Sequence, residues 1–343
     1  MARKPRIRRF FAGALILIIL SGCASTPPNE NGDHETNIEA NAPDSETPSD
    51  TKADGDVFFT FVDDTEREIV LPESPKRIVV LSPQLLDLLY AVDGTAVARA
   101  TASGGSVPKE AENLEDVGGI TTVNTEKLVA LNPDLVIGST SFHRDLADIL
   151  DASGIPLALF TLSTYEDLKE KALLMGKLAG TESSAEEQLA ALDQKINEWV
   201  EQLPAENGPT FIMLNVAPSS VSVQRSNTVG LEVAEMLRMS NVAEEMEASD
   251  SRPTTAPFSL EKIAELDPEF VFILIHGAQE DGLNKIEAEL SSQPAWQSLR
   301  AVKEERMFVL PSDLLLSNPG FRLHESVEYL AKLVYPESFG NGE

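Results

Sequence analysis

A pattern of polar and apolar positions occurs twice in the chain, 135 positions apart, at residues 124–137 and 259–272. Each copy has a polar residue, a glutamate two positions later, apolar residues at helical spacing, a proline and a short apolar run. The polar residue suits a helix N-cap, and the proline ends the helix because it disfavours the right-handed helical region for the residue before it. The apolar run suits a strand covered on both faces. Each half is therefore predicted to contain a helix followed by a parallel strand.

Further apolar runs alternate with helical patterns around both copies. Strands are predicted at 78–81, 96–98, 135–137, 157–160, 210–216, 270–275 and 307–310, a hairpin at 58–71, and helices at 230–239 and 321–334. This alternation predicts the α/β class, with two Rossmann-like lobes whose sheets are mostly parallel. Because open sheets place ligands at the carboxyl ends of their strands, we expect a ligand cleft between the lobes.

A long amphipathic helix is predicted between the lobes. Apolar residues recur three to four positions apart between Leu189 and Leu203, and Ser184 with Glu187 fits a capping box at the start. We expect this single stiff helix to connect the lobes; packing on only one lobe is the alternative. The N-terminal lobe is placed at 57–163, the helical linker at 164–207 and the C-terminal lobe at 208–343.

The first 22 residues have the pattern of a secretory signal. Five basic residues precede an 11-residue apolar run, which is too short to span a bilayer as a helix. The run ends in Leu20-Ser-Gly-Cys23, which resembles a bacterial lipobox, so Cys23 is predicted to become a lipidated N-terminus. Residues 23–56, rich in Pro, Asn, Ser, Thr and acidic residues, predict a disordered acidic tether. An extracytoplasmic protein, anchored to the cell membrane by lipid, follows.

The charge, the cysteine content and the motifs of the chain exclude several classes of function. A formal net charge of −29 argues against nucleic acid or an anionic membrane surface as a direct partner. Cys23 is the single cysteine of the sequence, which excludes disulfides and, once it is lipidated, thiolate chemistry. We find no phosphate-binding loop, dinucleotide glycine pattern or nucleophile elbow, so we expect no enzyme activity and no intrinsic cofactor. A surface hydrolase is the least favoured alternative.

Several segments together resemble the iron-complex and cobalamin substrate-binding proteins of ABC importers. They are Asp63-Asp64, residues 77–83, residues 117–119, the first copy of the repeated pattern and residues 296–303. In that family two α/β lobes joined by a long helix hold a metal chelate and deliver it to a membrane permease. The resemblance implies a monomer that captures haem or a ferric siderophore and passes it to a permease dimer with its ATPase. A cobalamin receptor of the same family and a ligand sensor without transport are the alternatives left open.

The resemblance implies roles for two glutamates. Glu126 and Glu261 stand at the same place in the two copies of the pattern. In the family, glutamates at these motif positions pair with arginines on the two permease subunits. A carboxylate in the first turn of a helix also stabilises that helix terminus, and both roles are compatible.

His276 is the candidate iron ligand, because it follows an apolar strand and precedes Gly277, as the haem ligand does in haem receptors of this family. A structural role is the alternative, and His143 is a weaker candidate. Those receptors carry a methionine after the Val-Gly motif, where this chain has Ile120 and Thr121, so the sequence defines no second axial ligand.

The other candidate ligand-binding residues lie in loops expected after strand ends: Ser82, Gln84, Thr121, Ser141, Asn215, Arg225 and Arg252, with His276 and Gly277. Arginine pairs with carboxylates in a bidentate manner, so cleft arginines would neutralise haem propionates or an anionic siderophore. Arg144 and Arg322 are further candidates for this role.

Overall fold

The computed structural model describes residues 57–101, 107–204, 207–250 and 252–340 of the chain. These residues belong to one compact unit, Asp54–Glu343. The predicted signal segment, Cys23 and the predicted tether lie outside the described residues. Within the described ranges, no helix combines the length and the apolar character that crossing a membrane requires.

The N-terminal lobe is built on a sheet with strand order β6-β5-β4-β3-β7-β8, in which β6 is antiparallel to β5 and the other pairs are parallel. The strands are β3 (Ile78–Val80), β4 (Ala98–Thr101), β5 (Glu115–Gly119), β6 (Thr122–Val123), β7 (Leu135–Ser139) and β8 (Leu157–Phe160), and the predicted hairpin forms from β1 (Phe59–Val62) and β2 (Glu68–Leu71). The helices are α1 (Pro83–Ala91), α2 (Thr125–Ala130), α3 (Ala147–Ala152) and α4 (Tyr165–Ala179), with short 3₁₀ segments at Lys109–Ala111 and Arg144–Leu146.

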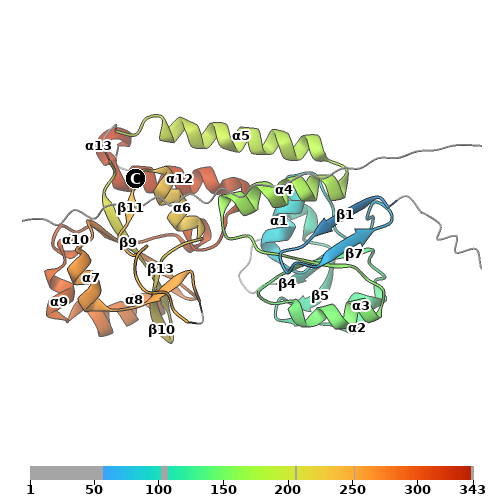
Figure 1. Cartoon of the computed structure of the whole chain (residues 1–343), viewed down its shortest axis with the longest axis horizontal. Coiled ribbons are helices and arrows are strands. Elements are labelled where there is room, and N and C mark those ends of the chain that lie inside the picture. Colours follow the sequence, from blue (N-terminus) through green and yellow to red (C-terminus); the bar gives the residue numbers. More distant parts are fainter. Residues whose placement is uncertain (1–56, 102–106, 205–206, 251, 341–343) are drawn as a thin grey trace, which may run out of the picture. The chain divides into compact units, whose positions relative to one another are not determined.

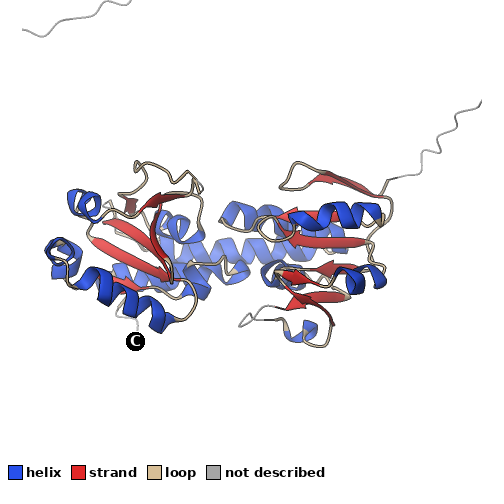
Figure 2. Ribbon diagram, turned by 90° about the horizontal axis from the view of Figure 1, so that it is seen from below, coloured by secondary structure: helices blue, strands red, loops and turns tan. Residues whose placement is uncertain are grey.

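The C-terminal lobe has the strand order β12-β10-β9-β13-β14, with β11 beside β9. Its strands are β9 (Thr210–Ala217), β10 (Ser220–Gln224), β11 (Ser240–Asn241), β12 (Thr255–Pro257), β13 (Phe270–Ile275) and β14 (Met307–Val309). Its helices are α6 (Val229–Met236), α7 (Leu260–Leu266), α8 (Gln279–Ile286), α9 (Pro294–Ser298), α10 (Arg300–Lys303), α11 (Ser312–Leu315), α12 (Leu323–Val334) and α13 (Pro336–Phe339), with a π segment at Glu287–Ser291 and a 3₁₀ segment, η4, at Gly320–Arg322. β10 runs antiparallel to β9 and β12, whereas β9, β11, β13 and β14 are parallel. Two α/β lobes with mostly parallel sheets are confirmed (Figure 2).

The repeated sequence pattern forms the same structure in both lobes. The side chains of Asn124 and Ser259 cap α2 and α7 by accepting from the backbone N–H three residues on, at 2.9 and 3.3 Å. The residues before the two prolines, Asn132 and Asp267, take left-handed conformations with φ of 47° and 41°, which stops both helices. The following strands, β7 and β13, each pair in parallel with the first central strand of their lobe.

A single long helix, α5 (Glu182–Val200), connects the lobes. It packs against α4 on the side of the N-terminal lobe and against α12 in the C-terminal lobe (Figure 1). Its apolar stripe of Ala185, Leu189, Leu192 and Ile196 is buried. The prediction of one connecting helix is confirmed.

The predicted capping box of Ser184 and Glu187 is wrong. α5 begins at Glu182, two residues before Ser184, whose hydroxyl donates instead to the carboxylate of Asp93 at 2.6 Å. The start of α5 is set by Gly180, which ends α4 in the left-handed region with φ of 72°. The capping box of this region lies at the start of α4, between Thr164 and Asp167.

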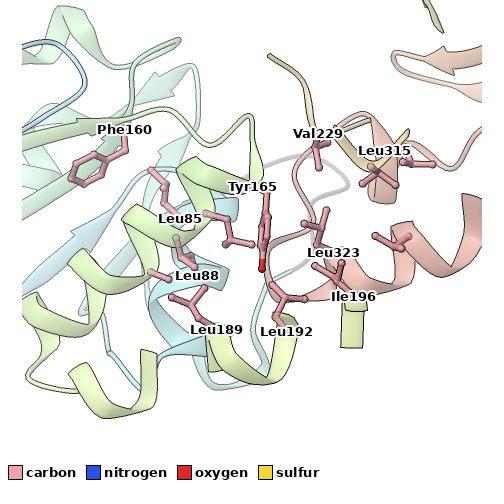
Figure 3. Packing of buried hydrophobic residues seen from close by; sticks show 14 of the residues in the cluster. Leu85, Leu88, Phe160, Tyr165, Leu189, Leu192, Ile196, Val229, Leu315 and Leu323 are labelled. Atoms are coloured by element: carbon pink, nitrogen blue, oxygen red, sulfur yellow. The ribbon is translucent and has the colours of Figure 1, made fainter. Parts of the chain in front are cut away.

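One cluster of buried side chains runs through both lobes and α5 (Figure 3). It joins Leu85, Leu88, Phe160 and Tyr165 of the N-terminal lobe and its first linker helix to Leu189, Leu192 and Ile196 of α5, and to Val229, Leu315 and Leu323 of the C-terminal lobe. Separate clusters cover the opposite faces of the two sheets. Because burying one such side chain stabilises a fold by about 1.5–3 kcal/mol, the shared cluster holds the two lobes together.

Candidate ligand-binding site

Two pockets lie between the N-terminal and the C-terminal lobe. A pocket of about 200 Å³ is lined on one side by residues that follow β3 and β8 and on the other by residues of the C-terminal lobe: Gln84, Leu162 and Ser163, and Thr228, Val229, Leu316, Ser317 and Asn318. A second pocket of about 480 Å³ is lined by α1 and by residues that follow β14, among them Asp87 and Asp313. The second volume falls within the range of about 300–1,000 Å³ usual for small-molecule sites.

Gln84 and Asn318 link the lobes where these two pockets meet. The Gln84 side-chain amide donates to the backbone carbonyl of Asn318 at 3.3 Å. The Asn318 side-chain amide in turn donates to the carbonyl of Thr164 at 2.7 Å, and Asn318 is only 5% exposed. Gln84 was predicted from its place after a strand, whereas no spacing or motif in the sequence marks the hydrogen bond of Asn318 to a residue 154 positions away.

Asp87 lies in the wall of the larger interlobe pocket. Burial raises the pKa of its carboxyl group to about 6, and the positive charge of Arg322 opposes this rise. Arg322 itself is paired with Glu325 and Asp313, at 3.0 and 3.4 Å. The arrangement places two carboxylates, one from each lobe, on the wall of one pocket near a single guanidinium group.

His143 is a structural residue. It is 1% exposed; its Nδ1 accepts from the backbone N–H of Ser139 at 2.9 Å and its Nε2 donates to the carbonyl of Ile120 at 2.8 Å. Burial lowers the pKa of His143, so the ring is neutral at pH 7 with its proton on Nε2. Because both ring nitrogens are occupied, His143 ties the loop after β5 to the loop after β7 and has no nitrogen free for a metal.

His276 is placed differently. Its backbone N–H donates to Val216 at 2.8 Å, while its side chain is exposed and, within the described residues, its ring makes no hydrogen bond. Partial burial of the ring and then the charge of Arg252 lower the pKa of His276, which favours the neutral imidazole that binds metals. Gly277, with φ of 91°, turns the chain sharply after it and lines a pocket of about 520 Å³.

The remaining predicted residues differ in how much of the side chain solvent can reach. Ser82 is buried at the start of α1, and Thr121 and Ser141 are exposed in the loops after β5 and β7. Asn215 accepts a hydrogen bond from Gln224 at 2.9 Å on the face of the C-terminal sheet. Arg252 is exposed.

Arg225 does not line either interlobe pocket. Its guanidinium group donates to the carbonyls of Pro253 and Glu244, at 2.8 and 3.1 Å, and it lines a pocket of about 410 Å³ whose described residues all belong to the C-terminal lobe. Arg144 likewise donates to a nearby carbonyl, that of Thr140, at 2.9 Å. Both arginines hold loops in place.

Glu126 and Glu261 occupy equivalent places. Both are exposed in the first turn of a short helix, α2 or α7. The opposite end of each helix is held by an arginine, since Arg77 donates to the carbonyl of Leu131 at 2.7 Å and Arg300 to that of Asp267 at 3.1 Å. Each lobe thus presents one carboxylate on a helix that is fixed at both ends.

A model of the family described as "Periplasmic binding protein" matches residues 78–314. The chain is 25% identical over 346 residues to the ABC transporter substrate-binding lipoprotein YvrC of Bacillus subtilis, covering 98% of this chain and 99% of that protein. It is 23% identical over 327 residues to the Fe(3+)-citrate-binding protein YfmC of the same organism, covering 94% of each. The crystal structure of the periplasmic heme binding protein HutB of Vibrio cholerae matches with a TM-score of 0.62 at 23% identity, covering 76% of this chain and 99% of that one.

Proposed function

Because the chain belongs to the periplasmic binding protein family and is the substrate-binding protein of an ABC importer, we propose that its cargo is an iron complex held between the two lobes. The family is not catalytic, and its members work with a permease and an ATPase. One observation carries the proposal: residues of both lobes, among them residues that follow β3, β8 and β14, line shared pockets. The names of YfmC and HutB, which bind ferric citrate and haem, support iron as the metal.

Calorimetric titration of the protein with haem, ferric citrate, a ferric catecholate siderophore and cobalamin tests the proposal. We expect one iron complex to bind with a Kd of about 1 μM or tighter, which corresponds to about −8 kcal/mol. Binding of cobalamin alone, or of none of the four, would contradict an iron cargo.

We further propose that His276 ligates the iron when the cargo is haem, because its ring is free of hydrogen bonds among the described residues and its lowered pKa keeps it neutral. The expected result is a shifted Soret band that His276→Ala removes and that His324→Ala, which removes an imidazole from α12 outside both interlobe pockets, does not. An identical haem spectrum in His276→Ala rules the ligation out.

We also propose that Glu126 and Glu261 dock the loaded protein on the two permease subunits, since each is exposed on an equivalent helix of its lobe. Charge reversal at either position should reduce uptake into cells without changing cargo affinity. Glu265→Lys, at an exposed position of the same helix α7, is the matched control. Uptake that is equally reduced by all three reversals would point to general charge rather than to docking.

A further inference from the structure

Phe142 is a large apolar side chain displayed to solvent at the carboxyl edge of the N-terminal sheet. It is 57% exposed and lies in the polar loop after β7, between Ser141 and His143. In the sheet, β7 lies between β3 and β8. The loops after both of those neighbours line the interlobe pocket, so the loop that carries Phe142 leaves the same edge toward the C-terminal lobe.

The ring is displayed on a rigid support. His143, its neighbour, is anchored by the N–H of Ser139 and the carbonyl of Ile120. The rings of Phe142 and His143 meet edge to face, with centroids 6.3 Å apart. A Cβ at Gly138 would lie 3.1 Å from the His143 ring, so the glycine gives the histidine its space. A preorganised aromatic side chain loses little conformational freedom when a ligand packs on it.

The internal repeat relates this ring to the candidate iron ligand. With the 135-residue offset of the repeated pattern, Ser141 corresponds to His276 and Phe142 to Gly277. β7 and β13 are the equivalent strands of the two lobes, and each pairs in parallel with the first central strand of its sheet. In the loops that follow these equivalent strands, the N-terminal lobe offers an aromatic ring, and the C-terminal lobe offers, one position earlier in the aligned pattern, an imidazole whose pKa responds to the nearby charge of Arg252.

We propose that Phe142 forms the wall of the ligand site on the N-terminal lobe and selects a chelate with a flat aromatic face, a porphyrin or an aryl chelate such as a catecholate. This inference rests on the proposed function and gives it a substrate class. The aromatic face of the cargo packs on Phe142, its other side faces His276, and its anionic groups lie toward Arg252. Protein ligation of the metal then comes from the C-terminal lobe alone. Ferric citrate, which has no aromatic face, gains nothing from the ring.

The test compares Phe142→Ala and Phe142→Trp with Ile149→Ala, a control that removes another exposed apolar side chain of the same lobe, on α3. Affinities for haem, metal-free protoporphyrin, a ferric catecholate siderophore and ferric citrate are measured on the intact protein by titration, with thermal melting to confirm folding. We expect Phe142→Ala to weaken binding of the aromatic ligand about 10- to 100-fold, as loss of a buried ring predicts, while Phe142→Trp and Ile149→Ala bind as the wild type does.

Each outcome decides a different point. Unchanged affinity in Phe142→Ala, or an equal loss for citrate, overturns the inference. Reduced uptake in cells with unchanged affinity also overturns it and assigns Phe142 to the permease interface. If the wild type binds metal-free protoporphyrin with the same dependence on Phe142 but binds no iron complex, the iron proposal fails and the aromatic wall stands. Absence of binding to all four probes overturns both.

Discussion

Glu232, on α6 of the C-terminal lobe, accepts a hydrogen bond from the backbone N–H of Tyr165, the first residue of α4. The Tyr165 hydroxyl donates to Asp193 of α5 at 2.5 Å. One tyrosine therefore binds the other lobe through its backbone and the connecting helix through its side chain. Figure 3 shows its ring in the middle of the shared cluster, between the side chains of the two lobes.

We predict that Glu232→Gln leaves the protein as stable as the wild type at pH 7 or slightly more stable, whereas Glu232→Ala destabilises it by about 1–2 kcal/mol. The alanine leaves the Tyr165 N–H without an acceptor, while glutamine keeps an oxygen. Burial raises the pKa of Glu232, with Asp167, Glu235 and Glu166 adding to the rise and the Tyr165 bond opposing it. Urea unfolding measures both variants.

The difference in stability between the wild type and Glu232→Gln should depend on pH, because the pKa of Glu232 is raised in the folded protein. Above pH 4.5 the folded protein holds the Glu232 proton more tightly than the unfolded chain does, so the wild type should gain stability relative to Glu232→Gln as the pH falls toward 4.5. Glu235→Ala, at an exposed position of the same helix, serves as the control. If Glu235→Ala lowered the free energy of unfolding as much as Glu232→Ala does, the result would contradict a specific link between the lobes through Glu232.

Asp87→Asn should stabilise the folded protein at pH 7 by about 0.5–1 kcal/mol, less than the full shift of its pKa to about 6 implies, because solvent screens part of the charge. The unfolded carboxyl group ionises near pH 3.8, before the folded one. Wild-type stability relative to the variant should therefore decrease as the pH rises from about 4 to about 6 and stay constant above. Thermal melting across this range measures the difference; a constant difference would show that Asp87 is not desolvated.

His143→Ala should destabilise the protein by about 2–3 kcal/mol, because it leaves the Ser139 N–H without an acceptor and opens a cavity. The pKa of His143 is lowered, so below pH 6.5 the unfolded chain takes up a proton before the folded one. The wild type should lose stability relative to the variant as the pH falls through that range, the opposite sign to Glu232 and Asp87. His324→Ala, on α12, is the control for loss of an imidazole. If it changed stability and its pH dependence as much as His143→Ala does, the structural role assigned to His143 would be contradicted.

Gly118→Ala adds only one methyl group but should lower the free energy of unfolding by about 2 kcal/mol or more. Gly118 has φ of 105°, and a Cβ there would lie 2.7 Å from the backbone oxygen of Thr122. Gly154 also has a positive φ, of 67°, but nothing lies within 4 Å of the added atom, so Gly154→Ala should cost only about 1 kcal/mol. Chemical unfolding measures the stability of both variants. If they lose similar amounts of stability, the backbone around Gly118 moves to accommodate the added methyl group.

Local signals determined what the sequence predicts well. The repeated helix and strand were found because their N-caps, prolines and apolar runs are encoded within 14 residues, and the bounds predicted for β8 and β13 are those observed. β10 and β12 were missed because they are short and partly polar, and their antiparallel pairing depends on β9. The wrong capping box shows the same limit, since Ser184 bonds Asp93, 91 positions away.

The candidate site was predicted less completely, for a related reason. Positions after strand ends identify loops, so Gln84 was expected at the interlobe edge, where the structure places it. The directions of long side chains depend on distant carbonyl groups, and Arg225 turns toward Pro253 and Glu244 rather than toward the N-terminal lobe. Asp87 and Asn318 acquire their environment only when segments more than 200 positions apart come together. Which of these residues contact the cargo stays a prediction.

The continuity of the cluster around α5 has a consequence for how the protein unfolds. Since Phe160, Leu192 and Leu323 belong to a single buried network, neither half retains its packing when the other melts. Heating should give one calorimetric endotherm, and a cargo that touches only one half protects both halves from proteases.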